Sequence, residues 1–115
     1  KIPAFCNVFP ELNHNEMESF DLTAESQKLS ENFLVIFVND NTDTEKIKKR
    51  MEITKNLLQK RGIKITEIKL KGESFLERVF NSLILADWVS YFVALSYKRD
   101  PQSVPLIEEF KKLIS

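Results

Sequence analysis

Apolar and polar positions along the chain predict strands separated by helices. Residues Phe33–Val38 form a continuous apolar run, which is typical of a strand covered on both faces in a parallel sheet. Residues Ile63–Leu70 predict the next strand, with a bulge or bend near Thr66-Glu67 because the isoleucines change phase there. The apolar segment Ile2–Phe9 predicts a further short strand, bracketed by prolines.

The polar turn after Phe33–Val38 leads into a predicted helix that runs to about Lys60. Thr42 with Glu45 fits a capping box at its start, and Gly62 suits its C-terminal end, where a positive φ costs glycine little. One face of this helix carries Ile47, Met51, Thr54 and Leu58.

A second capping box, Ser74 with Glu77, opens a long helix to about Lys98. Its stretch Val79–Leu95 is apolar nearly all round, but it is shorter than the ~20 residues of a membrane span and contains polar residues. This pattern favours a buried core helix. A short final helix is expected over Val104–Ile114. The order strand, helix, strand, helix predicts an α/β domain, a three-layer αβα sandwich with a parallel sheet.

Composition narrows the function classes. The chain has 115 residues, enough for one domain, and its 17 basic and 17 acidic residues balance. The missing basic excess argues against a nucleic-acid partner. The single cysteine excludes an intrachain disulfide and is typical of an intracellular protein, and one histidine with one cysteine cannot form a Cys/His zinc site. Two glycines exclude a glycine-rich phosphate loop within this chain.

Two polar segments follow predicted strands, where ligands bind in open α/β sheets. In Asn39–Asp43, Asp40 is better explained as a turn residue than as part of a receiver-type acidic pocket. In Pro10–Glu16, His14 lies among two asparagines and two glutamates. It is either a proton-transfer group oriented by these neighbours or a solvated loop histidine, and spacing alone favours the second.

Several segments together resemble one family, the bifunctional phosphoglucose/phosphomannose isomerases. Phe9–Glu16 resembles the family's PE-[LM]-NHNE motif. Four later segments are similar, in order, to its C-terminal domain: Gly72–Glu77, Leu85–Tyr91, Asp100-Pro101 and Ile107–Lys111. The resemblance covers essentially the whole chain.

The resemblance implies a sugar isomerase (SIS) domain spanning residues 1–115, the C-terminal domain of a two-domain aldose–ketose isomerase. The implied substrates are glucose 6-phosphate, mannose 6-phosphate and fructose 6-phosphate, interconverted through ring opening and a cis-enediol. His14 matches the histidine that assists ring opening. Lys111 matches an active-site lysine, with Lys112 as the competing register. No cofactor or metal is implied.

The same resemblance places the phosphate-binding domain and the proton-transferring glutamate upstream of Lys1, so this chain alone is expected to be inactive. It implies a cytoplasmic homodimer with the active site at the subunit interface, and neither a nucleic-acid nor a membrane partner. The alternative is a non-catalytic SIS-like module that binds a sugar phosphate or another subunit.

Overall fold

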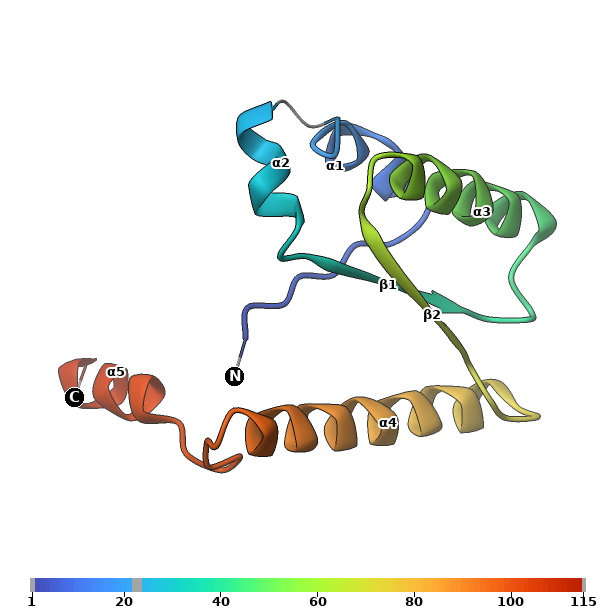
Figure 1. The fold of residues 1–115 in the computed structure, drawn as a ribbon. Coiled ribbons are helices and arrows are strands. Elements are labelled where there is room, and N and C mark those ends of the chain that lie inside the picture. The colour runs from blue at the N-terminus through green and yellow to red at the C-terminus, as the bar shows by residue number, and fades with distance from the viewer. Residues whose placement is uncertain (1, 22–23, 115) are drawn as a thin grey trace. The chain divides into compact units, whose positions relative to one another are not determined.

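The computed structural model describes residues 2–21 and 24–114, which divide into two compact units. The sheet unit is Ala4–Gly72, and the helical unit contains residues 73–114 with residues 2 and 3. Figure 1 shows the elements along the chain. The sheet unit has η1 (Glu11–Asn13), α1 (Asn15–Glu18), α2 (Ala24–Ser30), β1 (Leu34–Asn39), α3 (Glu45–Lys60) and β2 (Lys64–Lys69); the helical unit has α4 (Phe75–Ser96) and α5 (Pro105–Ile114).

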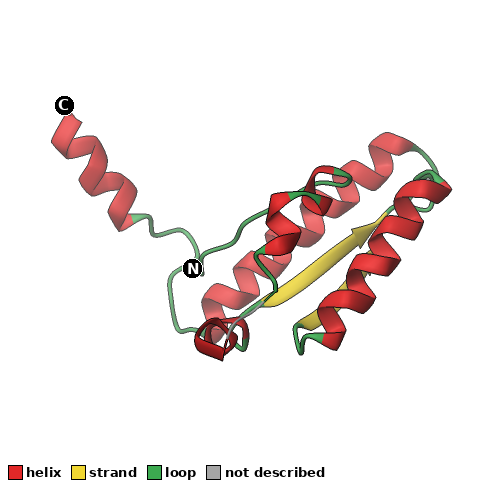
Figure 2. Ribbon diagram, turned by 90° about the horizontal axis from the view of Figure 1, so that it is seen from above, coloured by secondary structure: helices red, strands yellow, loops and turns green. Residues whose placement is uncertain are grey.

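The sheet consists of β1 and β2, which run parallel (yellow in Figure 2). Leu34 pairs with Lys64, and the register continues unbroken to Asn39 with Lys69. Parallel neighbours need a crossover connection, and α3 supplies it between the two strands. The predicted parallel pairing of these two segments is therefore confirmed.

The unbroken register shows that the predicted bulge near Thr66-Glu67 is wrong. Ile65 and Ile68 are three residues apart in a regular strand, so their side chains point to opposite faces of the sheet. Both are half-buried. The change of phase in the sequence thus comes from a strand with one apolar side chain on each face, and no extra residue is needed.

The buried core of the sheet unit lies between the sheet and α3. Phe37 of β1, Met51 and Leu58 of α3, and Ile63 before β2 form this cluster. The period of α3 brings Met51 and Leu58 onto the same face. Around the cluster pack the half-buried side chains of Phe9, Phe20, Val35, Ile47 and Ile65.

The two faces of β1 differ in their exposure. Phe37 is 5% exposed on the core face, whereas Leu34, Ile36 and Val38 alternate onto the other face and are 58%, 47% and 50% exposed. The continuous apolar run predicted a strand covered on both faces, and α3 covers only one of them. Within the described residues the second face of β1 is an exposed apolar surface.

Helix α3 begins two residues later than the predicted capping box. Thr44 is its N-cap and accepts a hydrogen bond from the Ile47 backbone N–H at 3.4 Å. The predicted cap, Thr42, is engaged in the preceding turn, where its hydroxyl and backbone N–H both donate to Asp40 Oδ1 at 2.8 Å. The side chain of Asp40 therefore takes Thr42 away from the helix.

Helix α3 ends in a Schellman motif centred on Gly62. The Gly62 N–H donates to the carbonyl of Gln59 at 3.0 Å, and the Ile63 N–H donates to the carbonyl of Leu58 at 3.2 Å. Gly62 has a φ of +79°, as the sequence predicted for a glycine at this place. The motif also joins Leu58 and Ile63 within the core cluster.

We expect Gly62→Ala to destabilise α3 by about 1 kcal/mol, because an L-residue resists a positive φ. No atom lies within 4 Å of the added Cβ, so the cost comes from the backbone alone. Hydrogen exchange of the α3 amides in the complete protein measures it. Gly62→Asn should cost less, since asparagine tolerates this conformation. Equal protection in Gly62→Ala and the parent would contradict the assignment.

The N-terminal segment differs from the prediction. Residues 2–8 have no regular secondary structure, so the strand predicted over Ile2–Phe9 is wrong. Pro3 and Pro10 lack the N–H that a ladder needs, and the side chains of Phe5 and Val8 are 87% and 65% exposed. Only Phe9 is half-buried, and its ring lies 6.1 Å from that of Phe37.

Helix α4 has the predicted cap. Ser74 accepts from the Glu77 N–H at 3.2 Å, and Glu77 Oε2 accepts from the Glu73 N–H at 2.8 Å. A helix that is apolar all round needs neighbours on every side, and most of the large apolar side chains of α4 are exposed. The predicted burial is thus not found among the described residues. By length and composition α4 could also cross a membrane, which is weak evidence because core helices meet the same test.

Helix α5 begins at Pro105, one residue later than predicted. Proline is favoured in the first turn, where its missing N–H has no partner to lose. Leu106, Phe110 and Leu113 are spaced along one side of the helix, and all three are at least 60% exposed. Helices α4 and α5 therefore both carry exposed apolar side chains.

Candidate active site

The loop that carries His14 is built from two very short helical segments. η1 ends at Asn13 and α1 begins at Asn15, so His14 is the residue between them. Its backbone N–H donates to the carbonyl of Glu11 at 3.0 Å, and the Asn13 N–H donates to the carbonyl of Pro10 at the same distance. These bonds turn the chain tightly and leave the side chain of His14 exposed.

The side chain of Asn13 ties this loop to α3. Asn13 Nδ2 donates to Thr54 Oγ1 at 2.8 Å, and Arg50 Nη1 donates to Asn13 Oδ1 at 3.4 Å. Met17 Sδ lies 3.5 Å from the same amide nitrogen. The sequence offered Asn13, Asn15 and Glu16 as neighbours that could orient the imidazole of His14. The amide of Asn13 bonds to α3 and makes no direct contact of this kind.

Neither anchor on α3 was identified from the sequence. Arg50 ends a basic run that is typical of a solvated helix face, and Thr54 stood among the apolar positions of that helix. The hydroxyl of Thr54 was the one feature of the sequence that could have indicated this contact. A threonine on a buried stripe needs a hydrogen-bond partner, and Thr54 is 1% exposed.

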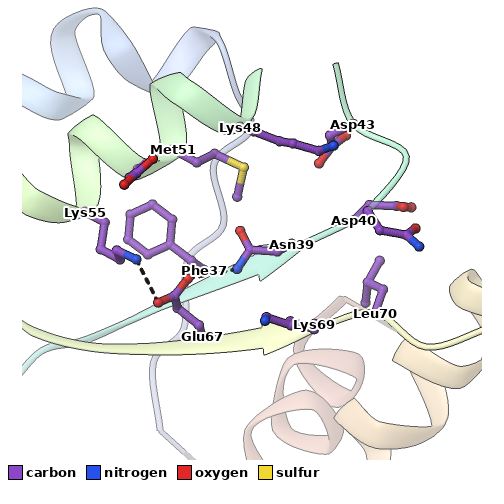
Figure 3. Close-up of a pocket in the computed structure, with 12 residues that line it drawn as sticks. Phe37, Asn39, Asp40, Asp43, Lys48, Met51, Lys55, Glu67, Lys69 and Leu70 are labelled. Atoms are coloured by element: carbon purple, nitrogen blue, oxygen red, sulfur yellow. Dashed lines mark hydrogen bonds and ion pairs between the residues drawn. The ribbon is translucent and has the colours of Figure 1, made fainter. Parts of the chain in front are cut away.

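The second candidate segment lies at the carboxyl ends of the two strands. An open cavity of about 590 Å³ is found there, and Figure 3 shows its lining. The turn interpretation of Asp40 is confirmed by its two bonds to Thr42. The lining residues come from β1, β2, α3 and the turns after the strands: Phe37, Asn39, Asp40, Asn41, Asp43, Lys48, Met51, Glu52, Lys55, Glu67, Lys69 and Leu70.

Opposite charges in this cavity compensate one another. Lys55 Nζ lies 2.9 Å from Glu67 Oε1 (dashed line in Figure 3), and Asn39 Nδ2 donates to Glu67 Oε2 at 3.1 Å. The hydrogen bond from Lys55 is the main cause that lowers the pKa of the Glu67 carboxyl, the Lys55 charge and Asn39 add to it, and desolvation opposes it. Glu67 is thus an ionised partner of Lys55 at neutral pH, which does not suit a proton donor.

Lys111 lies on α5, in the helical unit, whereas His14 belongs to the sheet unit. The Lys111 ammonium forms an ion pair with Glu108 Oε1 at 2.9 Å, one helical turn away. Exposed pairs of this kind are worth little and break readily, so the amine can turn toward a ligand. Lys112, the competing register, is the next residue of the same helix.

Acidic side chains, His14 and Cys6 do not gather into a metal site. Over residues 2–21 and 24–114, no group of three or more His, Cys, Asp or Glu side chains is placed to hold a metal ion.

Comparisons with known proteins identify the family of the chain. The family model of the bacterial phosphoglucose isomerase C-terminal SIS domain matches residues 1–114. The chain is 36% identical to the bifunctional phosphoglucose/phosphomannose isomerase of Thermoplasma acidophilum, over 100% of this chain and 34% of the relative. It is 35% identical to the protein of the same name from Aquifex aeolicus, over 97% of this chain and 34% of the relative.

A third relative with the same name, from Caldicellulosiruptor bescii, is 34% identical over 100% of this chain and 33% of the relative. No solved structure matches the chain. The chain spans about one third of the length of the curated relatives it matches. It belongs to the family of bacterial phosphoglucose isomerase C-terminal SIS domains. Its SIS-type α/β fold, predicted from the sequence, is shown by this match and by the parallel sheet.

Proposed function

We propose that this chain is the C-terminal part of an aldose–ketose isomerase that interconverts glucose 6-phosphate or mannose 6-phosphate with fructose 6-phosphate. Support comes from the family match and from relatives named bifunctional phosphoglucose/phosphomannose isomerase. The observation that carries the proposal is the His14 loop. It presents an exposed imidazole and is tied to α3 through Asn13.

In this proposal His14 works on the cyclic form of the sugar. Ring opening moves a proton between the anomeric hydroxyl and the ring oxygen, and an imidazole exchanges protons readily near neutral pH. The second proton transfer, between C1 and C2, belongs to a glutamate upstream of Lys1. Serine and threonine side chains of a preceding domain hold the phosphate.

The proposal also includes the lysine on α5 and a second subunit. Lys111, or Lys112 in the other register, contributes a positive charge to the site, where negative charge develops on the enediol oxygens. The enzyme is a cytoplasmic homodimer, and His14 reaches the sugar bound by the other subunit. The apolar side chains of β1 and α4 are exposed, and large exposed apolar surfaces are typical of protein–protein interfaces, which supports a second subunit or a further domain.

Isomerisation by the complete protein tests this function. We expect the purified protein to form fructose 6-phosphate from both glucose 6-phosphate and mannose 6-phosphate, measured by enzyme-coupled absorbance. Residues 1–115 alone should show no turnover, because the base and the phosphate site are supplied upstream. A complete protein that binds these sugar phosphates without converting them would favour the non-catalytic SIS-like module instead.

A further inference from the structure

We infer that Thr54 is a positioning residue for His14 and acts through the amide of Asn13. Thr54 and Arg50 each form a hydrogen bond with this amide, and we call the two bonds the clamp. The inference rests on the proposed function, since it assigns the clamp to the ring-opening step. All four residues belong to the sheet unit.

The geometry fixes which way the Asn13 amide faces. Arginine can only donate hydrogen bonds, so the atom of Asn13 that meets Arg50 must be the oxygen, Oδ1. The nitrogen, Nδ2, then faces Thr54 Oγ1, which accepts at 2.8 Å. A flip of the amide would turn Nδ2 toward Arg50 and lose that bond, and the Thr54 hydroxyl would have to donate instead of accept, so the bond to Arg50 fixes the direction of the bond to Thr54.

Because Thr54 is buried, its hydrogen bond to Asn13 is the stronger of the two bonds in the clamp. Thr54 is 1% exposed, so water does not replace Asn13 as a partner of its hydroxyl. A buried hydroxyl that loses its hydrogen-bond partner keeps the cost of desolvation, and this penalty favours the bond to Asn13. Arg50 is half-buried and its contact is longer, at 3.4 Å, so it contributes less.

His14 depends on this clamp because its own surroundings hold it weakly. η1 has three residues and α1 has four, and helical segments of this length are unstable without tertiary contacts. His14 is exposed, whereas Asn13, the residue before it, is anchored to α3. A displacement of about 1 Å in a reacting group can cost up to about 10²-fold in rate. The side chain of Asn13 thus sets where the imidazole is presented.

Thr54→Val and Thr54→Ser separate this role from simple packing. Valine keeps the shape of threonine and removes the hydroxyl, while serine keeps the hydroxyl and removes a methyl group. In the complete protein we expect Thr54→Val to lower kcat on glucose 6-phosphate about tenfold, the equivalent of one net hydrogen bond, with KM little changed. Thr54→Ser should lose thermal stability but keep kcat within about threefold, because its acceptor remains. If kcat followed thermal stability through the two variants, Thr54 would be a packing residue and the inference would fail.

A double-mutant cycle with His14→Asn shows whether Thr54 acts through His14. If it does, Thr54→Val should cost nothing further in the His14→Asn background, whereas independent effects would multiply. Multiplying effects would overturn the positioning role. The cycle also separates two failures. If His14→Asn leaves turnover unchanged, the proposed role of His14 is wrong. If His14→Asn is slow and Thr54→Val is as fast as the parent, only the clamp is wrong.

Discussion

We expect His14→Asn in the complete protein to lower turnover on cyclic glucose 6-phosphate by about 10²–10⁴-fold, the usual contribution of a general acid–base group. Asparagine keeps the approximate shape of the side chain and removes the imidazole ring that the proposed function uses for proton transfer. Folding should change little, because the side chain of His14 is exposed and makes no hydrogen bond with the residues that the structure describes. Coupled absorbance measures turnover, and circular dichroism checks the fold.

An open-chain substrate makes this prediction specific to ring opening. 5-Deoxyfructose 6-phosphate lacks the hydroxyl that closes the furanose ring, and its O6 is blocked by the phosphate. The His14→Asn variant should convert it at a rate close to that of the parent, since the proposed function assigns the C1–C2 proton transfer to an upstream glutamate. Equal losses on cyclic and open-chain substrates would move His14 to another step. An unchanged rate on the cyclic sugar would leave His14 as a loop residue.

The largest expected effect on stability comes from Leu58→Ala. Leu58 is 3% exposed within the core cluster, and truncating a buried leucine to alanine typically costs about 2–5 kcal/mol. The cavity would open beside Phe37 and Met51, which belong to the same cluster. Hydrogen exchange of the α3 amides in the complete protein gives the free energy of opening this region, and it does not require two-state unfolding of the whole protein.

Ile53→Ala on the same helix is the matched control. Ile53 is 49% exposed, so about half of it already contacts water and the truncation should cost less than about 1 kcal/mol. Alanine has a higher helix propensity than leucine or isoleucine, so similar losses of protection in the two variants would mean that burial does not set the loss. Such a result would contradict the core cluster as the source of stability.

The sequence predicted the central elements well because their signals are local. The apolar run of β1 and the glycine after α3 depend on neighbours within a few residues, and so does the capping box of α4. One error came from tertiary context. Whether Ile2–Phe9 forms a strand depends on pairing with another strand, which no local pattern reveals. The start of α3 moved for a local reason, because the Asp40 side chain accepts from the hydroxyl of Thr42 and competes with the predicted cap.

The role of the His14 loop as a site stays a prediction, and the side chains that hold this loop were not predicted from the sequence. The motif around His14 located the loop, and the resemblance supplied a role for the imidazole. The partners of Asn13 lie 37 and 41 residues away, at Arg50 and Thr54. A contact across that separation depends on how α3 packs over the sheet. In the sequence alone, Arg50 is typical of a solvated helix face and Thr54 of a position in the core.

The Schellman motif after α3 also bears on how the sheet unit opens. Leu58 closes the helix with its carbonyl and fills the core with its side chain. Ile63, directly before β2, donates its N–H to that carbonyl and also fills the core with its side chain. Fraying the last turn of α3 would therefore withdraw two core side chains and release the strand that follows. Helix and strand are thus coupled into one cooperative segment, and a local fluctuation at Gly62 is suppressed by the free energy of opening both. Because the clamp on Asn13 is carried by this same helix, the loop that presents His14 keeps its position for as long as β2 stays paired.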